Sequence, residues 1–171
     1  RKARNILGRT TWDRAHAYSI NPYAPYHACN RVLRAPFYEH RWDMGQIQRH
    51  SIFIGNASSP RKGAHFVLHA LAQLKQEYPD LKLYIAGLPP VRGARTRWKN
   101  LIGYPAYLRQ LIETLGLSAH VEFTGVVDAE RMAQLMCNAH LLVMASVIEN
   151  SPNTLGEAMI LGLPVVSAYT G

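Results

Sequence analysis

Two carboxylates carry all the formal charge in the last part of the sequence. From Met132 to Gly171 the charged side chains are Glu149 and Glu157, eight positions apart in the stretch IENSPNTLGEAM. No Lys or Arg follows Arg131, so neither carboxylate has a basic neighbour in this part of the chain. Carboxylate oxygens accept hydrogen bonds from hydroxyl groups, which makes this stretch the first candidate for a binding site.

The residues between the two carboxylates predict the start of a helix. Ser151 can supply the N-cap oxygen, and Pro152 suits the first helical position because its missing N–H would be unpaired there. Gly162 and Pro164 indicate the end, so we expect a helix over 152–161.

The start of this helix would be an anion site. The amides of Asn153 and Thr154 would lack an intrahelical acceptor, and the helix dipole adds the equivalent of about +0.5 charge. With Glu149 before the helix and Glu157 inside it, the stretch suits a ligand that carries phosphate and vicinal hydroxyls, such as a sugar nucleotide. The alternative is that Glu157 faces solvent and Glu149 is a loop charge, because two acids on one element are common.

Apolar runs alternate with helix-like segments from about residue 50 onward. The expected strands lie within 51–56, 81–87, 120–125, 141–146 and 164–169. Helices are expected over 64–78, 107–116 and 129–139, the last capped by Asp128. This alternation favours an α/β fold with a doubly wound parallel sheet, which binds ligands beyond the C-terminal ends of its strands. Those ends carry Gly55, Gly87, Gly125 and Ser146.

The first 50 residues differ in composition from the rest. They carry nine basic residues against three acidic ones, a plausible helix from Trp12 to Ser19 and the short run YHACN. We interpret them as an N-terminal appended segment at the edge of a neighbouring domain. The chain begins with Arg1 and stops at Gly171 directly after an apolar run, so we expect a fragment that is truncated at its C-terminus.

The composition is that of a globular protein, and it does not identify the binding partner. The 171 residues are 48% hydrophobic and 18% charged, which is typical of one globular domain, and the net charge of +8 favours an anionic partner. Nucleic acid, a membrane surface and a phosphorylated small molecule all fit. Cys29 and Cys137 are too few for a disulfide scaffold, and the sequence has neither a signal peptide nor a long apolar run. We therefore expect a cytoplasmic protein that contacts the inner membrane face peripherally at most.

Three further patterns in the sequence could indicate a binding site. The loop VRGARTRWKN (91–100) combines four basic side chains with a tryptophan, which suits nucleic acid or phosphate, although a solvated insertion explains it as well. His65 and His69 are four apart on a helix, but they lack the Glu and the third ligand of a zinc site. The segment GNASSPRKG after the first strand lacks the GxGxxG spacing of a dehydrogenase.

The order of motifs over residues 50–171 resembles the donor-binding C-terminal domain of family 4 retaining glycosyltransferases, which have the GT-B fold. The motifs are GNASSPRKG, LYIAG, FTG, the pair Glu149-x7-Glu157 with its following Ala-Met, and GLPVVSA. The segments GRTTWDRA, YHACN and LRAPFY are similar to those that join the two halves in some bacterial members. The resemblance therefore implies a Rossmann-like nucleotide-sugar-binding domain over 50–171 and, over 1–49, a remnant of an N-terminal domain with the interdomain segment.

The resemblance also implies roles for individual residues. Lys62 would meet the donor diphosphate, Glu157 the ribose hydroxyls, and Glu149 the transferred sugar or the charge that develops as it leaves. The phosphate oxygens would be held by the amides of Asn153, Thr154 and Leu155. The nucleobase would lie against the backbone of Gly125, Val126 and Val127. The donor would be a UDP-sugar or GDP-sugar, and no metal or other cofactor is implied, because a lysine and a helix terminus can stabilise the leaving diphosphate.

One position departs from the family pattern. Many members place an Arg directly after the glycine that ends the first strand, but Asn56 follows Gly55 here. Either Arg61 reaches round the loop to join Lys62 on the phosphate, or phosphate binding is weaker.

The acceptor site and the catalytic His of the family's N-terminal domain lie outside this chain. The resemblance thus implies a parent hexosyltransferase of bacterial capsule, lipopolysaccharide or exopolysaccharide assembly, and a fragment that transfers nothing by itself. The alternative function is a basic nucleic-acid-binding α/β module without enzymatic activity.

Overall fold

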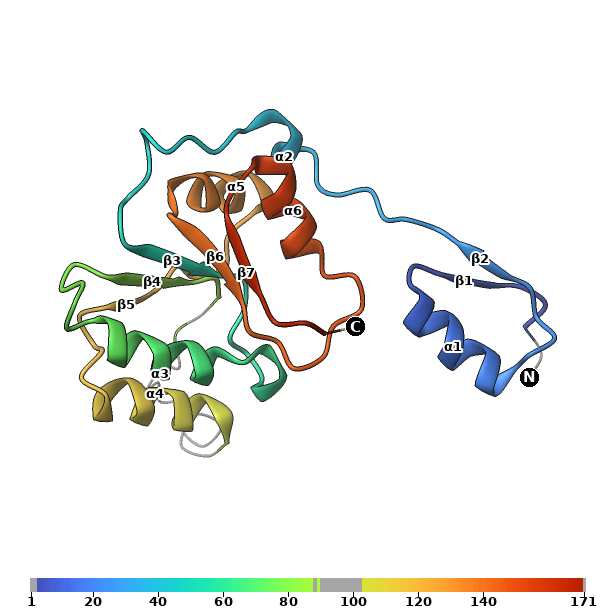
Figure 1. Cartoon of the computed structure of the whole chain (residues 1–171), viewed down its shortest axis with the longest axis horizontal. Coiled ribbons are helices and arrows are strands. Elements are labelled where there is room, and N and C mark those ends of the chain that lie inside the picture. Colours follow the sequence, from blue (N-terminus) through green and yellow to red (C-terminus); the bar gives the residue numbers. More distant parts are fainter. Residues whose placement is uncertain (1–2, 88, 90–102, 171) are drawn as a thin grey trace.

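The computed structural model describes residues 3–87, 89 and 103–170 (Figure 1). The main sheet of this part consists of five parallel strands in the order β5-β4-β3-β6-β7. The strands are β3 (Ser51–Ile54), β4 (Lys82–Ile85), β5 (Val121–Phe123), β6 (Leu141–Met144) and β7 (Val165–Ser167). Each lies within its predicted range, and the doubly wound α/β fold is confirmed. The basic loop 91–100 lies outside the described residues.

Four helices cover the two faces of the sheet (Figure 1). They are α3 (Ala64–Leu74), α4 (Tyr104–Thr114), α5 (Ala129–Asn138) and α6 (Asn153–Leu161). The first two pack on one face with a core that includes Ile52 and Ile54, and the last two pack on the other face around Phe53. Successive strand residues point to opposite faces, so β3 is buried on both sides. The crossovers change face between β3 and β6, which makes this pair the topological switch point.

The N-terminal segment forms a small unit of its own. Strands β1 (Ile6–Gly8) and β2 (Tyr26–Ala28) pair in parallel, with α1 (Thr11–Ile20) between them. Residues 29–35 lead from this unit to the short helix α2 (Pro36–Glu39) (Figure 1). The predicted helix is present, the short run YHACN contains β2, and β1 was not anticipated. The side chain of Phe37 in α2 is fully buried in the core beneath α5 and α6, which anchors the segment to the main domain.

Two predicted helix starts have different outcomes. Asp128 caps α5, and its side chain accepts a hydrogen bond from the amide of Arg131 at 2.8 Å, as expected. The prediction that Ser151 caps α6 is wrong. Pro152 is the N-cap residue, and no side chain caps this helix. Ser151 instead adopts a left-handed conformation with φ of 57°, so the chain turns into the helix one residue later than the Ser-Pro pattern predicts.

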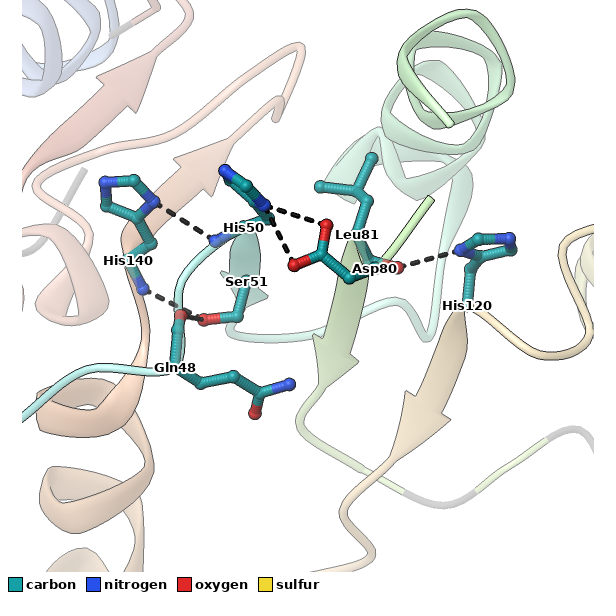
Figure 2. A network of polar contacts seen from close by, with 7 residues as sticks. All are labelled: Gln48, His50, Ser51, Asp80, Leu81, His120 and His140. Carbon is teal, nitrogen blue, oxygen red and sulfur yellow. Dashed lines mark hydrogen bonds and ion pairs between the residues drawn. The ribbon is translucent and has the colours of Figure 1, made fainter. Parts of the chain in front are cut away.

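A polar network joins the amino ends of β3, β4 and β6, on the side of the sheet opposite to the carboxyl ends of the strands (Figure 2). His50 Nδ1 contacts the Asp80 carboxylate at 2.8 and 3.0 Å, and this hydrogen bond holds the pKa of Asp80 below its usual value. The amide of His50 donates to His140 Nδ1 at 3.3 Å, and the amide of His140 donates to Ser51 Oγ at 3.0 Å. The contacts tie β3, β4 and β6 together at their amino ends, and we assign them a structural role.

The loops that follow β3 and β6 pack against each other at the carboxyl ends of the strands. After a short 3-10 turn, Gly63 adopts a φ of 69°, and an added Cβ there would overlap the carbonyl oxygen of Ala145. The amide of Val147 donates to the carbonyl of Arg61 at 2.9 Å. Glycine is therefore required at position 63 both by its backbone conformation and by close packing. This packing fixes the loop that carries Lys62 against the loop that carries Glu149.

The close approach at Gly63 gives a stability prediction. Gly63→Ala should lower the free energy of unfolding by roughly 1 to 3 kcal/mol for the left-handed conformation and by about as much again for the overlap with Ala145. Gly162→Ala is the matched control, because Gly162 also has a positive φ of 84° but nothing within 4 Å of an added Cβ. Urea unfolding of both variants measures the difference. Equal losses would contradict the packing described here.

Candidate functional site

A pocket opens at the switch point, at the carboxyl ends of β3 and β6. Its wall comes from these two strands, the loop after each and the start of α6. The lining residues are Ile54, Gly55, Asn56, Lys62, Leu142, Val143, Met144, Ser146, Glu149, Pro152 and Thr154. Open parallel sheets bind ligands in this place, because the chain leaves the two central strands in opposite directions and a crevice remains between them.

The start of α6 packs directly against the end of β3. An added Cβ on Gly55 would lie 2.8 Å from Thr154 Cγ2 and 3.1 Å from Thr154 Oγ1, so only glycine permits this approach. The first helical hydrogen bond runs from the amide of Gly156 to the carbonyl of Pro152 at 3.4 Å. Helix geometry therefore leaves the amides of 153–155 without an intrahelical acceptor, as the sequence predicts for an anion site beside the pocket.

Lys62 and Glu149 form an ion pair in the pocket wall. Lys62 Nζ donates to Glu149 Oε1, and the two side chains are 32% and 13% exposed. The interpretation of Glu149 as a carboxylate without a partner is thus wrong, because its cation comes from the loop after β3. A partly buried carboxylate needs such a partner. An anion that enters the pocket would meet an ammonium group that already faces it.

Glu157 is the most buried charged side chain in the described part of the chain, with 1% exposure. Arg34 from the segment before α2 binds both of its oxygens, at 2.7 Å from Nε to Oε1 and 2.9 Å from Nη2 to Oε2. This hydrogen-bonded pairing raises the pKa of Arg34, although desolvation opposes the shift. The alternative that Glu157 faces solvent is therefore wrong, and its basic partner comes from 123 positions earlier in the chain.

The N-terminal unit is hydrogen-bonded to Asn150, in the loop between Glu149 and α6. Thr10 Oγ1 donates to Asn150 Oδ1 at 2.6 Å, and Asn150 Nδ2 donates to Asp13 Oδ2 at 3.0 Å. Arg9 Nη2 also donates to the backbone carbonyl of Asn150 at 3.2 Å. Thr10 and Asp13 form the capping box of α1, a T-x-x-D pattern that is visible in the sequence. The role of Asn150 left no such signal.

Among the residues of this contact, Asp13 has the pKa that is shifted most. Its carboxylate accepts a hydrogen bond from the hydroxyl of Tyr26, and others from the amide of Arg9 and from Asn150. These bonds, the one from Tyr26 foremost, hold the pKa of Asp13 well below its usual value. The contact between the N-terminal unit and Asn150 therefore stabilises the ionised form of Asp13.

The predicted site residues separate into two groups. The pocket brings together Gly55, Asn56, Lys62, Glu149 and Thr154. Asn153 and Leu155 flank Thr154 in the first turn of α6, while Glu157 lies behind Arg34 and does not line the pocket. Arg61 is exposed and also lies outside the pocket lining, so the geometry does not support its role as a second phosphate-binding cation.

The predicted nucleobase edge lies apart from the pocket. Gly125, Val126 and Val127 follow β5, the edge strand, and Val126 is 82% exposed. The amides and carbonyls of Gly87 and Gly125 pair at 3.0 and 3.1 Å, which joins the loops after β4 and β5. Gly87 and Gly125 thus pair beyond the carboxyl ends of β4 and β5, on the same side of the sheet as the pocket, and Val126 beside them is exposed.

The described ranges contain neither a metal-binding cluster nor a membrane-spanning helix. Within them, no group of three or more His, Cys, Asp or Glu side chains is placed to hold a metal ion. His65 Nδ1 instead contacts the hydroxyl of Tyr104 at 2.9 Å. Among the helices of this same part, none has the length and apolar character needed to cross a bilayer.

The fold and the pocket define a class of protein, a Rossmann-like domain with a ligand site at its switch point. Residues 48–171 match the family model of glycosyl transferases group 1. The chain belongs to this family, and it is a glycosyltransferase domain of the GT4 type.

Curated relatives support the same family. The putative glycosyltransferase YtcC of Bacillus subtilis is 29% identical over 121 residues, which cover 70% of this chain and 28% of that protein. The D-inositol 3-phosphate glycosyltransferase of Corynebacterium urealyticum is 31% identical over 112 residues, covering 64% and 24%. The putative colanic acid biosynthesis glycosyltransferase WcaL of Escherichia coli is 30% identical over 113 residues, covering 63% and 25%. The chain spans about a quarter of the length of these relatives.

Solved structures show the same fold. The pneumococcal O-GlcNAc transferase GtfA, in complex with UDP and GlcNAc, has a TM-score of 0.76 at 15% identity, over 99% of this chain and 31% of that chain. HepE of Anabaena, in complex with UDP and glucose, has a TM-score of 0.74 at 21% identity, over 99% and 45%. The main domain thus corresponds to one Rossmann-like half of a GT-B glycosyltransferase.

The contact between the N-terminal unit and Asn150 predicts a pH dependence. Because the folded pKa of Asp13 is lowered, its contribution to stability is complete above the unfolded value of about 3.9 and is lost as the pH falls through the folded pKa. Asp13→Asn should lower the melting temperature near pH 7, and its difference from the wild type should shrink when both are measured near pH 3.

Glu122→Gln is the matched control, because Glu122 is an exposed carboxylate on the edge strand β5. This variant should melt close to the wild type at both pH values. A deficit of Asp13→Asn that is the same at both pH values would show that its ionised form does not stabilise the docked unit.

Proposed function

We propose that this chain provides the donor site of a retaining glycosyltransferase that takes a hexosyl group from a UDP-sugar or GDP-sugar. The observation that carries the proposal is the packing of the start of α6 against Gly55 at the switch point, beside Lys62 and Glu149. Free helix amides and a lysine suit a diphosphate, and carboxylates suit sugar hydroxyls. The UDP bound in the structures of GtfA and HepE, which share this fold, supports the proposal.

The chemistry assigns separate tasks to the charged groups. Transfer builds negative charge on the departing diphosphate and positive character on the sugar carbon. Lys62 and the amides of 153–155 stabilise the negative charge as it develops, because they are fixed and partly shielded from water. The diphosphate takes the place of Glu149 as the partner of Lys62. Glu149 is then free to contact the transferred sugar, so we propose it as the catalytic carboxylate.

The remaining contacts would fix the nucleoside. Glu157 accepts hydrogen bonds from the ribose hydroxyls, and Gly125, Val126 and Val127 form the edge against which the base lies. Gly125 follows the edge strand β5 and Glu157 lies in α6 behind Arg34, so we propose that both come within reach of a nucleoside whose diphosphate lies in the pocket. Asn56 replaces a cation at the end of β3, so phosphate binding depends on Lys62 and the helix amides. The charge of Arg61 contributes little because it is exposed.

The complete enzyme needs more than these residues supply. We propose that 50–171 is the donor-binding domain, and that 1–49 consists of the last part of an N-terminal acceptor domain and the segment that joins it to the donor domain. Assembly of a bacterial surface polysaccharide, at the inner face of the membrane, is the proposed setting, and the similarity to WcaL supports it. This polypeptide alone would bind a nucleotide and transfer nothing, so released UDP above the hydrolysis background, from a UDP-sugar with an acceptor, would overturn this part.

Nucleotide titration tests the phosphate site. Lys62→Met should weaken UDP binding by roughly 10- to 100-fold, because a charge-assisted hydrogen bond contributes about 1.5 to 3 kcal/mol. Isothermal titration calorimetry at fixed salt measures the affinity, and a parallel titration with GDP tests the base. Arg61→Met is the matched control, since it removes one neighbouring positive charge from the same loop.

The control separates a built site from general attraction to a basic protein. Arg61→Met should change the affinity by less than about threefold, as expected for an exposed charge. Equal losses in both variants, with a steep dependence on salt, would contradict the proposal and favour a nucleic-acid-binding surface.

A further inference from the structure

Arg34 occupies the carboxylate that the proposed donor needs for its ribose. Its guanidinium donates one N–H to each oxygen of Glu157, which leaves neither oxygen without a partner. The side chain of Arg34 is 44% exposed and that of Glu157 is 1% exposed, so Arg34 lies on the solvent side of the pair. Glu157 is absent from the pocket lining for the same reason. A ribose cannot reach this carboxylate while Arg34 stays in place.

The segment around Arg34 packs on α6 through the side chains of Leu33 and Arg34. Gly156 lies one residue before Glu157, and an added Cβ there would be 3.0 Å from Leu33 Cδ1. The guanidinium of Arg34 also stands over the ring of Phe37, with its carbon 4.9 Å from the ring centre. Phe37 is fully buried, whereas residues 29–32 before Leu33 are exposed. The segment is therefore fixed at its C-terminal end and held on α6 by these contacts of Leu33 and Arg34.

A ribose diol can replace the hydrogen bonds of the guanidinium, so that each oxygen of Glu157 keeps a donor when Arg34 leaves. Two adjacent hydroxyls offer two O–H donors, which equals the number of N–H groups that Arg34 gives to Glu157. The released guanidinium returns to water, where its charge is well solvated. The exchange therefore costs less than exposure of the carboxylate to an empty cavity would.

We infer that Arg34 is a displaceable cover on the ribose subsite, and that nucleotide binding releases residues 29–35 from α6. This inference rests on the proposed function, because it needs Glu157 to receive the ribose. Residues 29–35 connect the N-terminal unit to the main domain. Binding of the donor and the position of the N-terminal unit are thus coupled, and the coupling is reciprocal. Arg34 is a residue that controls access and takes no part in the chemistry.

Affinity measurements test the cover. Arg34→Ala should tighten UDP binding by about three- to tenfold, because the uncovered state no longer has to be populated at a cost. Glu157→Ala should weaken it. Arg31→Ala is the matched control, since it removes the same charge from an exposed position in the same segment and should leave the affinity close to that of the wild type.

Hydrogen exchange of the wild-type chain tests the same inference without a mutation. Saturation with UDP should speed exchange of the amides of Phe37 and Tyr38, which donate to the carbonyls of Arg34 and Ala35, while it protects the first turn of α6. This measurement decides the case if Arg34→Ala does not fold.

The outcomes separate the cover from the proposed function. If the wild type binds neither UDP nor GDP, the proposed function fails and the cover fails with it. If the wild type binds UDP and Glu157→Ala weakens binding, the proposed function stands. Weaker binding by Arg34→Ala, or slower or unchanged exchange of the Phe37 and Tyr38 amides with UDP, would then overturn the cover alone.

Discussion

The buried carboxylate of Glu157 is the constraint on which the arrangement of the site depends. A carboxylate with 1% exposure is stable in a folded protein when hydrogen bonds and a counter-charge replace its water. Arg34 provides both, and it draws the segment before α2 across the helix. The same helix presents its free amides to the pocket and packs against Gly55 at the end of β3. One element thus carries an anion site at its start and a buried acceptor one turn later.

The loop between β6 and α6 is where the separate parts of the chain meet. Its backbone packs on the loop after β3 through Val147, its Glu149 pairs with Lys62, and its Asn150 receives the capping box of α1. Each contact would be a modest stabilising term by itself. Together they hold a cation, a carboxylate and a helix terminus around one pocket. This geometry connects the proposed donor site to the N-terminal unit.

The sequence predicted what depends on local pattern. Apolar periodicity located all five strands of the main sheet and the helices between them, and the Asp128 cap was correct. Contacts between distant segments could not be predicted in this way. Glu149 and Lys62 are 87 positions apart, and Glu157 and Arg34 are 123 apart, so a count of nearby charges wrongly left both acids unpaired. The cap of α6 failed because the left-handed turn at Ser151 depends on the loop around it. The individual donor contacts stay predictions.

A crystal structure of this chain with UDP would test the central claim most directly. Our account predicts diphosphate oxygens within hydrogen-bonding distance of Lys62 Nζ and of the amides of 153–155, with the ribose hydroxyls on Glu157 in place of Arg34. A nucleotide bound at another edge of the sheet, or one whose ribose leaves Glu157 on Arg34 and whose phosphates do not touch the start of α6, would contradict it.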